Sequence, residues 1–235
     1  MSLPKGFVSG SIAAGLKSTG ALDLTIIQNV GPRNFATAVY TTNKVVAAPV
    51  IWSRQVTKGQ QVSAVVLNSG GANACTGPQG FADTHKTAEL IAEKLNLSAG
   101  EVVVCSTGLI GELLPMEKIA KGISAIELSS DGLENSAKAI MTTDSVPKMA
   151  VVDAEGAKFA GIAKGAGMLA PALATMLSVV MTDAEVDSAE ATTAFARAVE
   201  LTYNRIDSDG CTSTNDTVLF MSSGASGVKL NGEQL

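Results

Sequence analysis

Apolar runs in the first half of the chain predict β-strands. Residues 22–30 (LDLTIIQNV) and 35–41 (FATAVYT) are rich in β-branched and aromatic side chains, and Gly31 and Pro32 lie between them as a turn signal. We therefore expect these two segments to form a hairpin. Further strands are predicted at residues 47–53, 63–68 and 101–105.

Helices are predicted where apolar side chains recur at intervals of three and four residues. Residues 80–95 have this amphipathic spacing. Pro115 indicates the start of a second helix, because proline is tolerated in a first helical turn. Further helices are predicted at residues 133–141 and from Asp187 or Ser188, as N-cap, to about residue 204.

The segment from Lys164 to Ala184 is nearly uncharged and apolar, and Pro171 interrupts it. Its apolar part is too short to span a bilayer, so we predict a buried strand with an irregular approach. Residues 149–152 and 158–163 form a predicted hairpin that leads into it.

Strands and helices are mixed along the whole chain, and we find no internal repeat, low-complexity linker or domain boundary. This pattern predicts a layered α/β fold, α+β-like, in which mixed and largely antiparallel sheets pack with helices.

Composition narrows the function classes. The chain has 235 residues, of which 46% are hydrophobic and 17% charged, as in a globular protein. Its net charge of −5 argues against nucleic acid, whose phosphates require a basic surface. The first twenty residues lack the continuous apolar core of a secretory signal.

Cysteine and histidine limit the chemistry further. Cys75, Cys105 and Cys211 form no CxxC pair and are odd in number, which is typical of free thiols in a reducing cytoplasm. The single histidine, His85, lies on the charged face of a predicted helix, where a solvated side chain is the default. A zinc site is therefore not expected, and acid–base chemistry near neutral pH would require His85 or another base.

Three polar features are candidates for a site. The strand at 101–105 runs into Ser106-Thr107-Gly108, whose backbone N–H groups could form an anion or oxyanion pocket. Residues 68–77 (NSGGANACTG) are equally compatible with an ordinary strand-to-helix loop and with the floor of a site. Thr175, in the apolar segment, is by default a structural strand threonine unless its surroundings give it a role.

Five segments in this order closely resemble the ornithine acetyltransferase family, also called glutamate N-acetyltransferase, of arginine biosynthesis. The resemblance extends over the whole chain. The segments are NSGGANACTG (68–77), CSTGLIGELLPM (105–116), KAIMTTD (138–144), KGAGMLAPALATML (164–177) and DGCTSTNDTV (209–218).

The resemblance implies a set of site residues. The precursor would cut itself between Ala174 and Thr175, giving an α chain of residues 1–174 and a β chain whose N-terminal part is residues 175–235. Thr175 would then be the nucleophile, and Thr107 and Gly108 would form the oxyanion hole. The substrate-binding residues it implies are Thr142, Thr143, Lys164 and Thr175.

The resemblance also implies a reaction. Thr175 would take the acetyl group of N-acetylornithine and pass it to glutamate, through an acetyl-threonine. Its new α-amino group, with a pKa of about 7.7 to 8, would serve as base. We expect no cofactor, with acetyl-CoA as a candidate second donor, an α2β2 assembly of the two chains in the cytoplasm, and no nucleic-acid or membrane partner. Because the family's chains are longer, the rest of the β chain is expected to be absent here.

Two alternatives stay open. A self-processing amidase or aminopeptidase would use water in place of glutamate. A truncated, catalytically silent chain would act only as a subunit or folding partner. An acetyl-acceptor assay separates transfer from hydrolysis, and failure to cleave or transfer would favour the silent chain.

Overall fold

The computed structural model describes residues 2–168 and 176–235. Two large sheets form its centre, and the first of them, sheet A, has the strand order β1-β2-β4-β5. The first two pairs of neighbours are antiparallel and β4 runs parallel to β5. Most of β4 is buried, as expected for a central strand with an apolar sequence. The strands are β1 (Phe7–Ile12), β2 (Leu24–Asn29), β4 (Ala64–Gly71) and β5 (Val102–Leu109).

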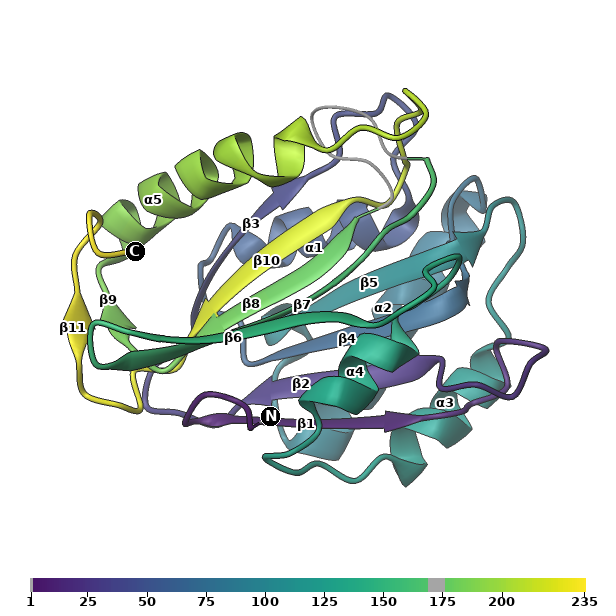
Figure 1. Cartoon of the computed structure of the whole chain (residues 1–235). Helices are drawn as coiled ribbons and strands as arrows, with labels where there is room; N and C mark the ends of the chain where they lie inside the picture. Colours follow the sequence, from purple (N-terminus) through teal and green to yellow (C-terminus); the bar gives the residue numbers. More distant parts are fainter. Residues whose placement is uncertain (1, 169–175) are drawn as a thin grey trace.

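Sheet B has the order β3-β10-β8-β7-β6 (Figure 1). Its β10–β8 pair is parallel and its other pairs are antiparallel, so both sheets are mixed and largely antiparallel, as predicted. The strands are β3 (Phe35–Tyr40), β6 (Lys148–Ala154), β7 (Ala157–Lys164), β8 (Leu177–Thr182) and β10 (Thr217–Ser222), and a separate short pair joins β9 (Glu185–Val186) to β11 (Lys229–Leu230).

Helices cover one face of sheet A and part of the outer face of sheet B (Figure 1). The apolar faces of α2 and α3 pack on one side of sheet A, and α5 packs on β3 and β10 of sheet B. Between the sheets lies the largest apolar cluster, which α4 closes beside β1, β2 and the β6–β7 hairpin. The helices are α1 (Ala48–Thr57), α2 (Gly77–Leu95), α3 (Met116–Ala125), α4 (Leu133–Ala139) and α5 (Ser188–Leu201), with short 3₁₀ turns at Ala99–Glu101 and Tyr203–Arg205.

The predicted hairpin of residues 22–30 and 35–41 is wrong, although both strands exist. β2 belongs to sheet A and β3 to sheet B, so the turn between them crosses from one sheet to the other. Asn29 fixes this crossing, because its Nδ2 donates to Arg33 O at 2.9 Å and to Ser222 O at 3.1 Å. Long-range pairing with β10 therefore prevails over the local turn signal.

The predicted strand at 47–53 is also wrong, because this segment begins helix α1. Pro49 lies in the first turn, where its missing N–H costs nothing. The helix covers the edge of β5: the Ser53 hydroxyl donates to Val104 O at 2.8 Å and accepts from Val104 N at 3.0 Å. Trp52 Nε1 donates to Val102 O at 3.0 Å, so α1 satisfies backbone groups of an edge strand.

The other predicted elements are confirmed with shifted ends. The Asp187 side chain caps α5 by accepting from Ala189 N and Glu190 N, and α5 ends at Leu201, earlier than predicted. Within the predicted strand of the 164–184 segment, residues 177–182 form β8. Residues 155–156 form the turn between β6 and β7, so the predicted hairpin is confirmed.

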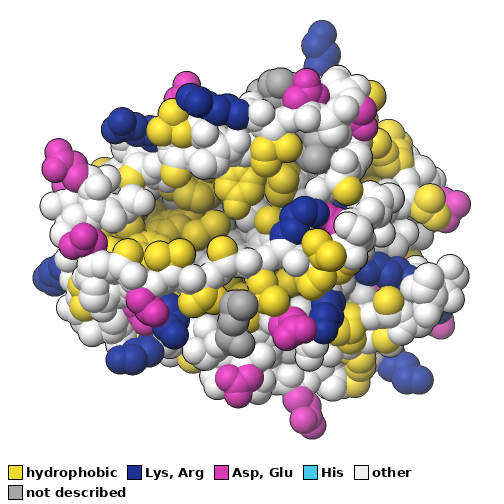
Figure 2. Space-filling view, viewed as in Figure 1, with side chains coloured by type: hydrophobic (Ala, Val, Ile, Leu, Met, Phe, Trp, Pro, Cys, Tyr) yellow, Lys and Arg dark blue, Asp and Glu magenta, His cyan; other side chains and the backbone are white. Residues whose placement is uncertain are grey.

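One part of sheet B has no helix over it. Figure 2 shows hydrophobic side chains in a hollow between α5 and the β6–β7 hairpin. The hollow has a volume of about 360 Å³ and includes Met149, Phe159 and Tyr203. Across the described residues, no helix has the length and apolar character needed to cross a membrane.

The inter-sheet layer yields a stability prediction. Val179 on β8 is fully buried, whereas Val152 on β6 is 55% exposed. We expect Val179→Ala to lower the free energy of unfolding by about 2 kcal/mol, because two buried methyl groups are lost and a cavity remains. The matched Val152→Ala should change it by less than about 0.5 kcal/mol. Equal losses in denaturant titrations would show that this layer is not the core.

Candidate active site

A cavity of about 1020 Å³ lies where β4, β5, α4 and β7 end. Its described walls come from the loop at residues 16–22, from Gly70, from residues 107–109, from α4 with the turn that follows it, and from Gly167 and Met168. Four of the residues expected in the site, Thr107, Gly108, Thr142 and Thr143, line this one cavity.

Thr107 and Gly108 lie at the end of β5, beside a bulge in β4. Gly71 pairs with both Thr107 and Leu109, which interrupts the regular parallel ladder. Gly108 has φ +132°, and a Cβ there would lie 2.4 Å from the backbone carbon of Gly70. Only glycine fits this close crossing of two strands.

The loop that forms the opposite wall depends on Asp23. This carboxylate is fully buried and accepts hydrogen bonds from three backbone amides, those of Ala14 at 2.7 Å, Leu16 at 2.6 Å and Lys17 at 3.0 Å. The backbone of Asp23 in turn accepts from Ser69 N at 2.9 Å. The loop is thereby held against the end of β4.

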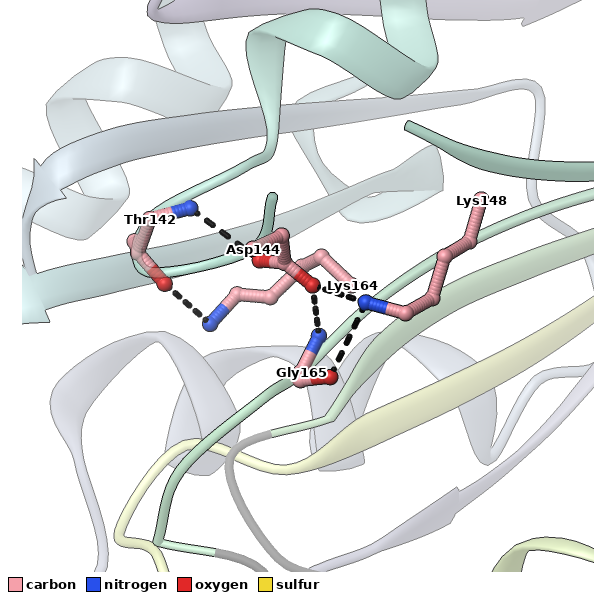
Figure 3. Close-up of polar contacts among 5 residues, drawn as sticks. All are labelled: Thr142, Asp144, Lys148, Lys164 and Gly165. Atoms are coloured by element: carbon pink, nitrogen blue, oxygen red, sulfur yellow. Dashed lines mark hydrogen bonds and ion pairs between the residues drawn. The ribbon is translucent and has the colours of Figure 1, made fainter. Parts of the chain in front are cut away.

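Lys164 lies behind the cavity wall, at the end of β7, and its side chain is fully buried. Its Nζ donates to Thr142 Oγ1 at 3.0 Å (Figure 3). Thr142 itself is exposed and lines the cavity. Because the ammonium occupies a lone pair of the hydroxyl, the hydroxyl proton is directed elsewhere, and the side chain can donate to a ligand.

Asp144 joins the turn after α4 to the end of β7 (Figure 3). Its carboxylate accepts from Gly165 N at 2.8 Å and Thr142 N at 3.3 Å, and it forms an ion pair with Lys148. Burial raises its pKa, but the hydrogen bonds from Lys148, Gly165 and Thr142 outweigh burial and leave the pKa below its ordinary value. Asp144 therefore stays ionised at neutral pH and holds Thr142 beside Lys164.

The charges around the cavity favour an anion. The described lining residues include Lys17 and Lys138, the latter paired with Glu134 at 2.6 Å, and no carboxylate, in a chain whose net charge is −5. Burial lowers the pKa of Lys164 to about 8, although Asp144 and Asp216 oppose the shift. Lys164 is thus largely protonated at pH 7, and a ligand carboxylate would find a positive field here.

The remaining expected residues are placed as follows. Ala174 and Thr175 lie outside the described residues. From the 68–77 segment, Gly70 is among the described residues that line the cavity. The segment therefore serves mainly to connect β4 to α2. Within it, Asn73 Nδ2 donates to Gly80 O at 2.8 Å and holds the start of α2.

His85 and the cysteines occupy ordinary positions. His85 is half exposed on α2, and its ring packs against Trp52 with centroids 4.9 Å apart. Cys75 and Cys211 are exposed and Cys105 is buried, and all three are free thiols. Among the described residues, no group of three or more metal-ligating side chains is assembled.

Sequence reasoning missed Lys17, Asp23 and the role of Asp144. Asp144 lies inside the KAIMTTD motif, so the motif contained a signal for it. Lys17 and Asp23 had no such signal, because only the folded loop places Lys17 at the cavity and its backbone amides on the buried Asp23.

Comparison with known sequences identifies the family. The sequence profile of the ArgJ family matches residues 8–235. The chain belongs to the ArgJ family. It is 57% identical over 226 residues to the arginine biosynthesis bifunctional protein ArgJ of Streptomyces coelicolor. This alignment covers 95% of this chain and 59% of that protein. The chain spans about three fifths of the length of the ArgJ proteins it matches.

Solved structures of the ArgJ family share this fold. The ornithine acetyltransferase of Mycobacterium tuberculosis, solved with ornithine, matches with a TM-score of 0.64 and 47% identity, over 73% of this chain and 94% of that one. The ArgJ protein of Bacillus halodurans matches with a TM-score of 0.64 and 32% identity, over 74% of this chain and 92% of that one. The layered, mixed α/β architecture is therefore that of the ArgJ family.

The crossing at Gly108 yields a prediction with a matched control. Gly111 also has a positive φ, of +93°, but a Cβ there meets nothing within 4 Å. We expect Gly111→Ala to cost about 1 kcal/mol of backbone strain. Gly108→Ala should cost at least about 2 kcal/mol more, because the added Cβ forces β4 and β5 apart. Equal losses in the free energy of unfolding for the two variants would contradict the close approach of β4 and β5 at Gly108.

Proposed function

We propose that the protein transfers an acetyl group from N-acetylornithine to glutamate, through an acetyl-threonine at Thr175. The observation that carries this proposal is the meeting of Thr107 and Gly108 with the Thr142–Lys164 pair at one cationic cavity. Membership of the ArgJ family supports it, since a relative solved with ornithine is an ornithine acetyltransferase. Both proposed substrates carry the carboxylate that such a cavity would attract.

The proposed nucleophile needs a base, and His85 is a poor candidate. His85 is the single histidine of the sequence, and it lies on α2 beside Glu89 and Trp52, outside the described cavity lining. Cleavage between Ala174 and Thr175 would create an α-amino group with a pKa of about 7.7 to 8 on the nucleophile itself. That amine would take the hydroxyl proton as Oγ attacks the acetyl carbonyl.

The other residues would act by binding. The Thr107 hydroxyl and the Gly108 N–H would stabilise the oxyanion, each by about 3 kcal/mol in the transition state. Thr142 would donate its hydroxyl proton to a substrate carboxylate, and the buried Lys164 ammonium behind it would strengthen that hydrogen bond. Thr143, which is exposed at the same wall, would complete the binding surface.

The assembly and the second donor are part of the proposal. We propose that the α and β chains of one precursor form an α2β2 enzyme in the cytoplasm, and that no cofactor is needed. Acetyl-CoA would be an alternative acetyl donor, which suits relatives named bifunctional. The small-molecule character of the substrates fits the cavity volume of about 1020 Å³.

The complete gene product tests this function directly. We expect the wild type to appear as two chains in denaturing mass spectrometry, the second beginning at Thr175, and to form N-acetylglutamate from N-acetylornithine and glutamate. Thr175→Ala should give one uncut chain and no transfer, because it lacks the nucleophile. Release of acetate without N-acetylglutamate would favour the amidase alternative, and an uncut, inactive wild type would favour the silent chain.

The pKa of Lys164 gives a pH prediction. Because burial lowers this pKa to about 8, the ammonium is lost as pH rises through that value. Carboxylate binding should weaken there, so KM for N-acetylornithine, whose α-nitrogen is acylated and does not titrate, should increase by up to about tenfold per pH unit above about pH 8. Lys164→Met should have a high KM at pH 7 and lack this increase. A wild-type KM that stays constant to about pH 9.5 would contradict the assigned role.

A further inference from the structure

The DGCTSTNDTV segment carries two buried polar side chains to which the proposed function gives no role. Asn215 is 5% exposed and Asp216 is fully buried, just before β10 begins at Thr217. Buried amide and carboxylate groups need partners, because burial without hydrogen bonds is costly. The partners of these adjacent residues lie on different sheets.

Asn215 binds sheet A next to the proposed oxyanion hole. Its Nδ2 donates to Ser106 O at 2.8 Å and to Ala72 O at 2.6 Å. Ser106 directly precedes Thr107, and Ala72 directly follows the bulge at Gly71. One amide group therefore fixes the ends of β4 and β5 together.

Asp216 binds the start of β8. Its Oδ1 accepts from Met176 N at 2.7 Å, while the next residue, Thr217, donates its N–H to Met176 O at 2.9 Å. The Asp216 carbonyl accepts from Thr41 N at 3.0 Å, which anchors the segment to the end of β3. Both backbone polar groups of Met176, the residue bonded to Thr175, are thus held by residues 216 and 217.

We propose that Asn215 and Asp216 are positioning residues that fix the Thr107–Gly108 end of β5 relative to the chain at Met176. The inference rests on the proposed acetyl transfer, in which the nucleophile and the oxyanion hole come from these two places. Apolar packing between the sheets is not directional, so it tolerates small sliding movements. Short hydrogen bonds from one rigid dipeptide to both sheets oppose that sliding.

The role proposed for Asp216 requires an acceptor and not a negative charge. Burial raises its pKa to about 6, against the hydrogen bond from Met176 N–H and the charge of Lys164. Among the described residues, its Oδ2 has no hydrogen-bond partner. An asparagine has the same shape and can present a carbonyl oxygen to Met176 N–H, whereas an alanine cannot.

The experiment compares kcat and KM for acetyl transfer in variants of the complete gene product. Asp216→Ala should lower kcat about 100-fold with KM changed less than about threefold, since a displacement near 1 Å can cost this much. Asp216→Asn should keep kcat within about tenfold of the wild type, because the acceptor remains.

Asp183→Ala is the matched control. Asp183 is also a buried carboxylate that anchors backbone amides, those of Lys5 at 3.2 Å and Lys158 at 2.9 Å, but it follows the opposite end of β8. The Asp183→Ala variant should therefore have a lower Tm than the wild type and an unchanged kcat. If Asp216→Ala does not fold, the isosteric pair decides: Asp216→Asn should keep kcat and Asn215→Asp, which turns a donor into an acceptor, should lose it.

Three results would overturn the inference. A kcat for Asp216→Ala as high as that of the control, or an Asp216→Asn variant as slow as Asp216→Ala, would exclude positioning through the Met176 hydrogen bond. In both cases the wild type would still transfer acetyl, so the proposed function would stand. A wild type without transfer would overturn the proposed function, and this inference with it.

Discussion

The apolar layer between sheets A and B is the interaction on which the rest of the structure depends. Its residues come from strands of both sheets and from α4, so it joins parts of the chain that are far apart in sequence. β3, from the first fifth of the chain, pairs with β10 near its end, and β8 lies between β10 and β7. The segment after residue 175 therefore supplies the centre of sheet B.

At one end of this layer, hydrogen bonds from polar side chains fix the relative positions of loops and strand ends that apolar packing alone would leave free to shift. Asp23 holds the loop at 16–22, Asp144 holds Thr142 to the end of β7, and Asn215 with Asp216 joins the two sheets. Each is buried and bonds backbone amides or carbonyls, whose geometry is specific. Carboxylates thus stabilise the walls, while the described cavity lining itself presents lysines and hydroxyls.

The sequence predicted local features better than long-range ones. The amphipathic spacing of α2 and the Asp187 cap of α5 were sufficient to place those helices. The hairpin failed because β3 finds its partner 177 residues away, at the Tyr40–Thr217 pair, and α1 failed because its apolar residues resemble a strand. For the site, the motifs indicated Thr107 and Thr142, but neither Lys17 nor Asp23, whose positions depend on tertiary contacts.

The most direct test of the proposed acetyl transfer is the identity of the acetylated residue in enzyme that is incubated with N-acetylornithine and quenched before glutamate is added. We expect one acetyl group on the peptide that begins with Thr175, removed when glutamate is supplied and present at much lower occupancy in a Thr107→Ala variant, which lacks an oxyanion donor. Acetylation of another residue, or an acetyl group on Thr175 that glutamate cannot remove, would contradict it.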